Sequence, residues 1–224
     1  MTNEGLRPVI AVLAVQGAFI EHEKRLKRLG CTCIELRQAS DLSQRFDGLV
    51  LPGGESTVQG KLIEELGMID RLRAIIQRGV PVLATCAGLI LLSKQVVNNG
   101  DSAGDSGSAS ASDSDSGDYP RLATLPVTVR RNAYGRQLGS FHTRADLLEQ
   151  GQIPMTFIRA PYVEQVGEGV EILAQVDGHI VAVRYGAQIA VSFHPELDAS
   201  DVVHKLFLDE VMCYRERSSN LPLT

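Results

Sequence analysis

The first half of the chain alternates short apolar runs with longer segments in which apolar residues recur every three or four positions. Apolar runs of strand length cover Val9–Val15, Cys31–Leu36, Gly48–Leu51 and Val80–Ala84. The helical periodicity between and after them predicts helices over 18–29, Thr57–Arg78 and Gly88–Val97. Strands that alternate with helices favour an α/β fold with a mostly parallel sheet covered on both faces.

The second half is richer in strands and closes with one helix. Apolar runs predict strands at Thr124–Arg130, Thr156–Arg159, Ile172–Val176, His179–Tyr185 and Gln188–Phe193. Helical spacing returns over Asp201–Tyr214. We therefore expect residues 1–224 to form a single domain of three layers, with a central sheet flanked by helices.

Residues 98–120 interrupt this pattern. They are mainly Ser, Gly, Asp and Ala, with no large apolar residue before Tyr119. Such a composition buries too little apolar surface to offset the entropy cost of ordering the chain. We expect a disordered loop inserted within one domain, with a phosphorylatable Ser/Asp tract as the functional alternative.

Charge and hydropathy narrow the classes of protein. The net charge of −5 equals the contribution of five aspartates within 98–120, a segment without Lys or Arg, so the remainder is formally neutral. This lacks the basic footprint of a nucleic-acid-binding protein. No apolar run approaches the length of about 18 residues that a membrane-spanning helix needs. The N-terminus shows no signal-peptide pattern, and we expect a cytoplasmic protein.

Cys86 is the first candidate for chemistry. It lies between the apolar run Val80–Ala84 and the helical segment that starts near Gly88, which predicts a strand, a sharp turn and a helix. Backbone N–H groups at the start of a helix favour a thiolate and a developing oxyanion. A lone buried cysteine is more often a core residue, so a catalytic role requires a base elsewhere in the chain.

His194 and Glu196 are the candidate base and its carboxylate partner. In an extended segment residues i and i+2 project to the same side, and Pro195 stiffens the link between them. A carboxylate beside an imidazole sets its tautomer and stabilises the imidazolium. The pair also suits a metal site, but the remaining histidines are scattered along the sequence, and we expect no metal centre.

Five parts of the sequence carry a family resemblance: Val12–Phe19 with Glu21 and His22, Leu51–Thr57, Thr85–Ile90, Val129–Gln137, and Phe157–Pro161 with Ser192–Leu197. Together they resemble class I (triad) glutamine amidotransferases, whose fold is flavodoxin-like. The cysteine turn and the His-x-Glu pair are common to all triad amidotransferases. The segments 53–57, 130–137 and 157–161 narrow the resemblance to the glutaminase subunits of pyridoxal 5′-phosphate synthase.

The resemblance implies a role for each matching residue. Cys86 would be the nucleophile, His194 the general base and Glu196 the orienting carboxylate. Gln16 would couple to the oxyanion hole when a partner docks. The oxyanion hole would use the backbone N–H groups of Gly54 and Ala87, and glutamine would be bound by Gly54, Glu55, Ser56, Arg131, Ile158 and Arg159.

The resemblance also implies the reaction. L-glutamine would be hydrolysed to L-glutamate and ammonia through a γ-glutamyl thioester on Cys86, without a cofactor. The ammonia would pass to a synthase subunit in a hetero-oligomer that makes pyridoxal 5′-phosphate (vitamin B6). Two alternatives remain open: the glutaminase subunit of another amidotransferase, such as that of histidine biosynthesis, and a catalytically silent regulatory module of the same fold. The sequence departs from the family at Ala84, where glycine is usual, and in the length of 98–120.

Overall fold

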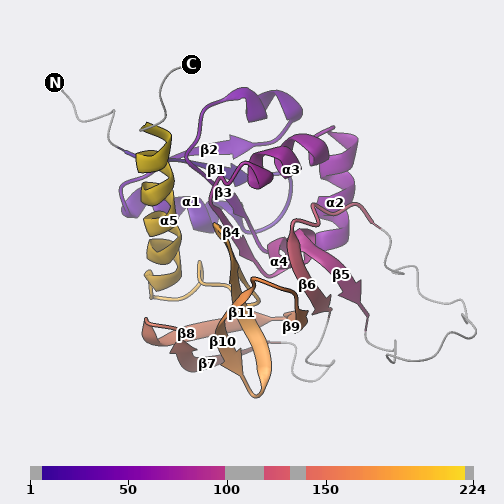
Figure 1. Ribbon diagram of the computed structural model, residues 1–224, viewed down its shortest axis with the longest axis vertical. Helices are drawn as coiled ribbons and strands as arrows, with labels where there is room; N and C mark the ends of the chain where they lie inside the picture. Colours follow the sequence, from indigo (N-terminus) through magenta and orange to yellow (C-terminus); the bar gives the residue numbers. More distant parts are fainter. Residues whose placement is uncertain (1–6, 99–118, 132–139, 220–224) are drawn as a thin grey trace, which may run out of the picture.

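The computed structural model describes residues 7–98, 119–131 and 140–219. The disordered insertion expected at 98–120 therefore lies mostly outside the described residues. Five helices are described: α1 (Phe19–Arg28), α2 (Ser56–Glu65), α3 (Ile69–Gln77), α4 (Ala87–Leu92) and α5 (Val202–Ser219). A large central sheet separates them into two layers (Figure 1).

One half of the central sheet is parallel. It consists of β1 (Val9–Leu13), β2 (Thr32–Leu36), β3 (Gly48–Leu51), β4 (Val82–Thr85) and β12 (Gln188–Val191). Their spatial order is β2-β1-β3-β4-β12, and every neighbouring pair is parallel. This is the strand order of flavodoxin-like folds, in which sites form beyond the carboxyl ends of the strands. The expected α/β class and mostly parallel sheet are confirmed.

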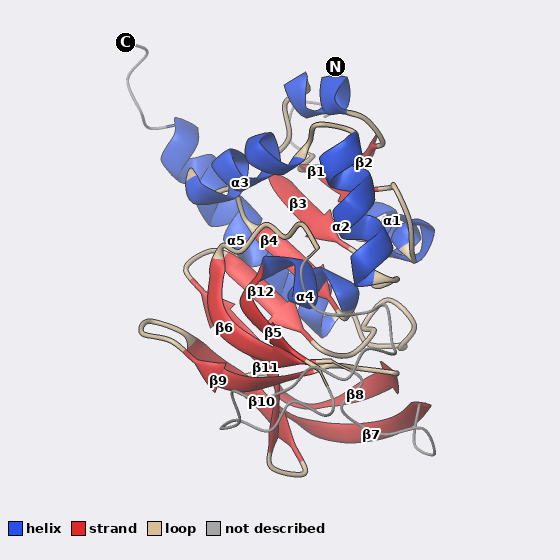
Figure 2. Ribbon diagram, turned by 90° about the vertical axis from the view of Figure 1, so that its right-hand side faces the viewer, coloured by secondary structure: helices blue, strands red, loops and turns tan. Residues whose placement is uncertain are grey.

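The sheet continues beyond β12 in mainly antiparallel pairs through β11, β9 and β6 to β5, and β10 joins at β11. Only the last pair, β5 with β6, is parallel in this half among the described strands. A hairpin forms a separate small sheet beside it (Figure 2). The bounds are β5 Ser93–Val97, β6 Leu125–Arg130, β7 Ser140–Leu147, β8 Gly151–Ile158, β9 Tyr162–Val166, β10 Glu171–Val176 and β11 His179–Tyr185.

Alternate residues of the buried strands supply two cores. On β1, Ala11 and Leu13 belong to the core beneath α2, α3 and α4, whereas Ile10 and Val12 belong to the core beneath α1, α5 and the β7–β8 hairpin. Strand residues point alternately to opposite faces, so a nearly continuous apolar run serves both cores. Within the described residues, no helix is long and apolar enough to cross a membrane.

Two predicted helices were wrong in extent. The segment Thr57–Arg78 forms two helices, because Gly67 has a φ of +65° and ends α2. The segment Gly88–Val97 is helical only to Leu92, after which Ser93–Val97 pairs with β6 as strand β5. Strands β7 and β9 were also missed, since their exposed polar positions weaken the apolar signal.

Candidate active site

Four chain segments meet at the carboxyl end of the parallel half of the sheet. Gln16 follows β1, the Gly53–Gly54 turn follows β3, Cys86 follows β4 and His194 follows β12. They surround a cavity of about 500 Å³. Apart from Glu196, every residue assigned above to the site lines this cavity, together with Gly17, Ala18, Gly53 and Ile90.

Cys86 occupies a strained turn. Its backbone has φ +48° and ψ −101°, a conformation that L residues rarely adopt. The N–H of Cys86 donates to the carbonyl of Val191 at 2.8 Å, which joins the turn to the end of β12. A Cβ on Gly88 would collide with the carbonyl oxygen of Leu51, so helix α4 packs this closely on β3 only because that residue is glycine.

Ala84 fits the sheet without distortion. It is fully buried within β4, where it pairs with Leu51 on one side and Ala190 on the other. Its φ is not among the positive values, and the left-handed conformation begins at Cys86 itself. The methyl group that replaces the usual glycine is therefore accommodated in the core.

His194 lies between Cys86 and Glu196. Its Nδ1 is 2.7 Å from Glu196 Oε1, and both side chains are buried. Burial by itself would lower the pKa of His194, but its hydrogen bonds to Cys86 and Glu196 raise that pKa to about 10. A Cβ on Gly53 would overlap the His194 ring, so this glycine leaves room for the imidazole. The arrangement holds an imidazolium against the cysteine sulfur.

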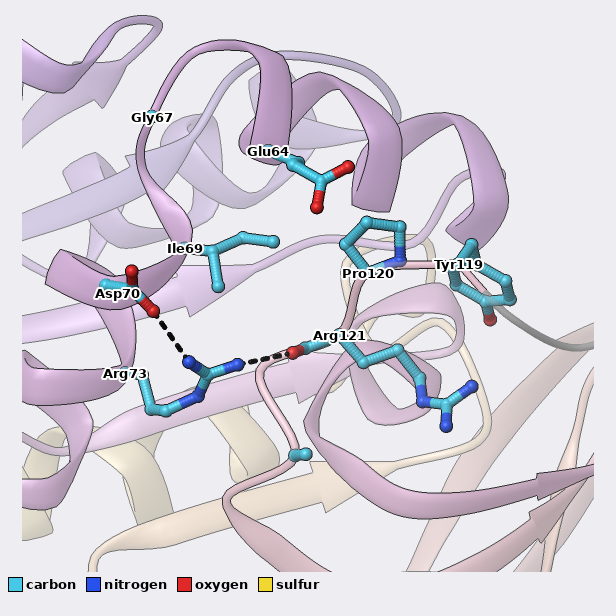
Figure 3. Close-up of a pocket in the computed structure, with 9 residues that line it drawn as sticks. Glu64, Gly67, Ile69, Asp70, Arg73, Tyr119, Pro120 and Arg121 are labelled. Carbon is cyan, nitrogen blue, oxygen red and sulfur yellow. Dashed lines mark hydrogen bonds and ion pairs between the residues drawn. The ribbon is translucent and has the colours of Figure 1, made fainter.

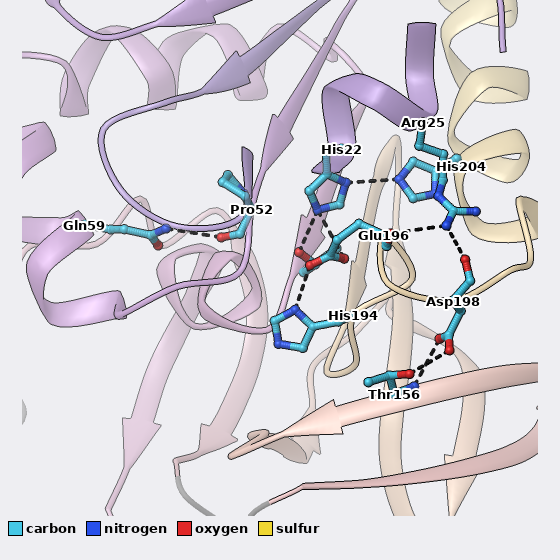
Figure 4. A network of polar contacts seen from close by, with 10 residues as sticks. His22, Arg25, Pro52, Gln59, Thr156, His194, Glu196, Asp198 and His204 are labelled. Carbon is cyan, nitrogen blue, oxygen red and sulfur yellow. Dashed lines mark hydrogen bonds and ion pairs between the residues drawn. The ribbon is translucent and has the colours of Figure 1, made fainter. Parts of the chain in front are cut away.

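Two further histidines lie behind Glu196 (Figure 4). His22 of α1 places Nε2 3.3 Å from Glu196 Oε2 and 3.2 Å from Thr85 Oγ1. On its other side, His22 Nδ1 lies 3.0 Å from Nε2 of His204 on α5. Both histidines are fully buried. The sequence analysis had left them among scattered histidines, and only the position of His22 within a family-like segment hinted at a role.

Burial governs the charge of this inner network. It is the main cause that lowers the pKa of His22, and it lowers the pKa of His204 to about 2. Burial alone would raise the pKa of Glu196, but the flanking His22 and His194 bring it below the ordinary value. At neutral pH the network therefore consists of two neutral histidines behind an ionised carboxylate.

The opposite wall of the cavity carries a charged cluster. The Glu55 carboxylate caps helix α2 by accepting N–H bonds from Thr57 at 3.1 Å and Val58 at 2.6 Å. The guanidinium of Arg131 lies 3.3 Å from Glu55 Oε1, and its side chain is nearly buried. The Glu55 N–H donates to Gln16 Oε1 at 2.9 Å. The cavity thus presents a cation and an anion that are already paired with each other.

Tyr119 supports this wall and was not predicted as a site residue. Its hydroxyl lies 3.0 Å from Ser56 Oγ, and the Arg131 guanidinium sits 5.5 Å from its ring centroid. The side chain is buried and follows directly after the undescribed part of the insertion. As the first large apolar residue after a polar tract, Tyr119 carried the sequence signal that could have identified it.

A larger cavity of about 720 Å³ lies between α2, α3 and residues 119–123 (Figure 3). It contains no residue assigned to the site. Its arginine, Arg73, already binds the carbonyls of Arg121 and Leu122 and the carboxylate of Asp70. No group of three or more His, Cys, Asp or Glu in the described part of the chain is arranged to hold a metal ion.

Comparison with known proteins gives consistent matches. The model of the SNO glutamine amidotransferase family matches residues 12–213. A relative from Desulfitobacterium hafniense (strain Y51), named pyridoxal 5′-phosphate synthase subunit PdxT, is 57% identical over 90% of this chain and 92% of its own length. A protein of the same name from Methanocorpusculum labreanum is 48% identical over 90% of this chain and 97% of its own.

Solved structures agree with these matches. A structure described as a glutamine amidotransferase is 39% identical, with a TM-score of 0.79, and the match covers 91% of this chain and 98% of that one. A GMP synthase subunit from Thermoplasma acidophilum has a TM-score of 0.65 at 17% identity, over 96% of this chain and 98% of that one, which shows a shared fold alone.

Proposed function

Because the chain belongs to the SNO glutamine amidotransferase family, we propose that it is a glutaminase that hydrolyses L-glutamine to L-glutamate and ammonia. The observation that carries this function is the arrangement of Cys86, His194 and Glu196 at one cavity. A strained cysteine, an imidazole hydrogen-bonded to it and an orienting carboxylate form the nucleophile, base and orienter of acyl transfer.

The reaction follows from these groups. The Cys86 thiolate adds to the carbon of the side-chain amide, and the displaced electron pair moves onto oxygen. Backbone N–H groups of Gly54 and Ala87 would stabilise that oxyanion. The His194 imidazolium then protonates the amide nitrogen, ammonia leaves and a γ-glutamyl thioester remains. Neutral His194 removes a proton from water, the hydroxide adds to the thioester, and glutamate departs with regeneration of the thiolate.

Glutamine recognition is assigned to the charged wall. The α-carboxylate of glutamine requires a cation, and Arg131 is the buried guanidinium that lines the cavity. The α-ammonium requires an acceptor, which Glu55 provides. Ser56 and the segment Ile158–Arg159 complete the binding surface, and the positive φ of Arg159, +45°, turns the backbone at the end of β8.

The relatives are named subunits of pyridoxal 5′-phosphate synthase, and we propose that this chain delivers its ammonia to such a synthase subunit. Segment 16–18 supports control of the site by docking. Its Ala18 N–H binds the carbonyl of Gly53 at 2.9 Å, and its Gln16 side chain binds the N–H of Glu55. A partner that shifts this segment would reorient the turn that carries Gly54. No cofactor, nucleic acid or membrane enters this scheme, and the cytoplasmic location stays a prediction.

A glutaminase assay with and without the cognate synthase tests the proposal. Cys86→Ala should abolish glutamate release, whereas Cys213→Ala, at an exposed free cysteine on α5, should keep the wild-type rate. Glutamate release that survives Cys86→Ala would contradict the assignment of the nucleophile. Equal activity with and without synthase would contradict control by docking but not the chemistry.

The two alternatives give different results in the same experiment. A silent regulatory module would release no glutamate even when the synthase is bound. The glutaminase of another pathway would hydrolyse glutamine but would not transfer ammonia to the pyridoxal 5′-phosphate synthase subunit, and it would not be recovered with that subunit in a pull-down.

A further inference from the structure

The carboxylate of Glu196 has two oxygens, and the catalytic histidine uses only one. Oε1 receives the N–H of His194 at 2.7 Å. Oε2 is fully buried and accepts no geometrically complete hydrogen bond among the described residues, but Nε2 of His22 lies 3.3 Å from it. A buried carboxylate oxygen without a donor is costly, so the group facing it matters for the orientation of the whole carboxylate.

Chemistry restricts how His22 can face this oxygen. A neutral imidazole has one N–H and one bare nitrogen. If the bare nitrogen faced Glu196, its lone pair would oppose the carboxylate charge in a site without water. If Nε2 carries the hydrogen, it donates toward Glu196 Oε2 and Thr85 Oγ1, and Nδ1 becomes an acceptor. The neighbouring His204 can then donate to Nδ1 through its own Nε2, 3.0 Å away.

His204 completes the chain at no further cost in donors. Its Nδ1 has no hydrogen-bond partner among the described residues, as expected for the bare nitrogen of a neutral ring whose hydrogen is on Nε2. The opposite tautomer would bury an unpaired N–H at the same place. Both ends of the histidine pair therefore favour the same direction of donation, from His204 to His22 to Glu196.

We propose that His22 is a positioning residue of the glutaminase site: its Nε2–H holds the second oxygen of Glu196, and His204 selects the tautomer of His22 that can do so. The inference rests on the proposed function, since it assigns Glu196 the role of orienting His194. Oriented in this way, the carboxylate keeps its first oxygen directed at His194, and His194 keeps its other nitrogen directed at Cys86.

Helix α1 supplies a second grip on the same segment. Arg25 lies three residues after His22, on the same face of the helix. Its guanidinium donates to the carbonyls of Glu196, Asp198 and Ser200. Because Arg25 fixes the backbone and His22 faces the side chain, α1 holds both parts of Glu196. The helix also begins directly after segment 16–18, which lines the cavity.

Two substitutions of His22 separate positioning from simple packing. Leu fills a similar volume but has no donor, whereas Gln places an amide N–H near the position of the histidine Nε2. His22→Leu should lower kcat roughly 10-fold or more with KM within about 2-fold, because the misplaced carboxylate affects the chemical step and not the substrate pocket. His22→Gln should retain kcat within about 3-fold of wild type. His179→Gln, on β11 outside the cavity, is the control for loss of a histidine.

Two readouts do not depend on glutamine turnover. The rate at which iodoacetamide alkylates Cys86 should fall in His22→Leu and recover in His22→Gln. NMR of the ¹⁵N-histidine-labelled full chain should show His22 as a neutral ring protonated at Nε2, and His204 likewise. These measurements test the positioning of the triad even if the wild-type chain proves to lack glutaminase activity, which would count against the proposed function alone.

Three results would overturn the inference. The first is a His22 ring that carries its hydrogen on Nδ1. The second is a folded His22→Leu variant with wild-type kcat and alkylation rate. The third is a His22→Gln variant as impaired as His22→Leu, although circular dichroism shows it folded. If His22→Leu fails to fold, the tautomer of His22 in the wild type and the activity of His22→Gln still decide the question.

Discussion

The burial of His204 predicts an acid-sensitive fold, and His204→Gln is the variant that tests it. The His204 side chain is fully buried, and the positive groups facing it are His22, Arg25 and Arg28, all on α1. Burial, followed by these groups, lowers its pKa to about 2, while the unfolded chain keeps the ordinary value of 6.5. Gln keeps an N–H directed at His22 but has no proton to gain.

The sign of the effect follows from proton binding. Since the folded pKa is depressed, His204 adds stability above pH 6.5, and this contribution falls as the pH drops toward the folded value, because only the unfolded state takes up the proton. Between about pH 7.5 and about pH 5 the linkage relation gives a loss of roughly 2 kcal/mol from this residue alone. The figure hardly depends on the folded pKa as long as that pKa stays well below 5.

Urea unfolding followed by circular dichroism at several pH values measures this loss. The wild type should lose the His204 contribution and a further one from His22, whose pKa is also lowered by burial. His204→Gln should lose about 2 kcal/mol less than wild type over the same interval. Each variant is compared with itself at two pH values, so a constant cost of the substitution cancels. Parallel curves for the two proteins would refute the reasoning.

Three other substitutions test the geometry of the site. Gly53→Ala should reduce kcat/KM roughly 100-fold in the glutaminase assay, because its Cβ would displace the His194 ring; an active variant would show that the ring has room. Tyr119→Phe should raise the KM for glutamine about 5-fold with kcat retained, since it loses only the hydrogen bond to Ser56, and an unchanged KM would exclude this support. Gly88→Ala should lower the free energy of unfolding in urea by roughly 1–3 kcal/mol through its collision with β3, and wild-type stability would contradict that contact.

The alternation of apolar runs and helical periodicity determined the α/β class by itself. Each apolar run had to be a buried strand, since a short run without polar positions can be covered only from both sides. The helix limits were less certain. Gly67 ends α2 within a continuous periodic pattern, and Ser93–Val97 could pair with β6 only once the distant strand was in place.

The candidate site divides in the same way. Cys86, His194 and Glu196 have chemical types and spacings that identify them locally, and the family-like segments identify the cavity wall. Their assignments remain predictions until the variants are measured, as does the single domain over residues 1–224. The insertion at 98–120 lies mostly outside the described residues.

Tertiary structure alone decided what stands behind the triad. His22 and His204 are 182 residues apart and show no spacing motif, yet α1 and α5 bring their rings to 3.0 Å beneath Glu196. A sequence records residue type and local period, so it reveals strands, turns and an i, i+2 pair. It does not record which polar side chains of two amphipathic helices face inward. Contact across the fold sets their burial, and burial in turn fixes their charge and their hydrogen bonds.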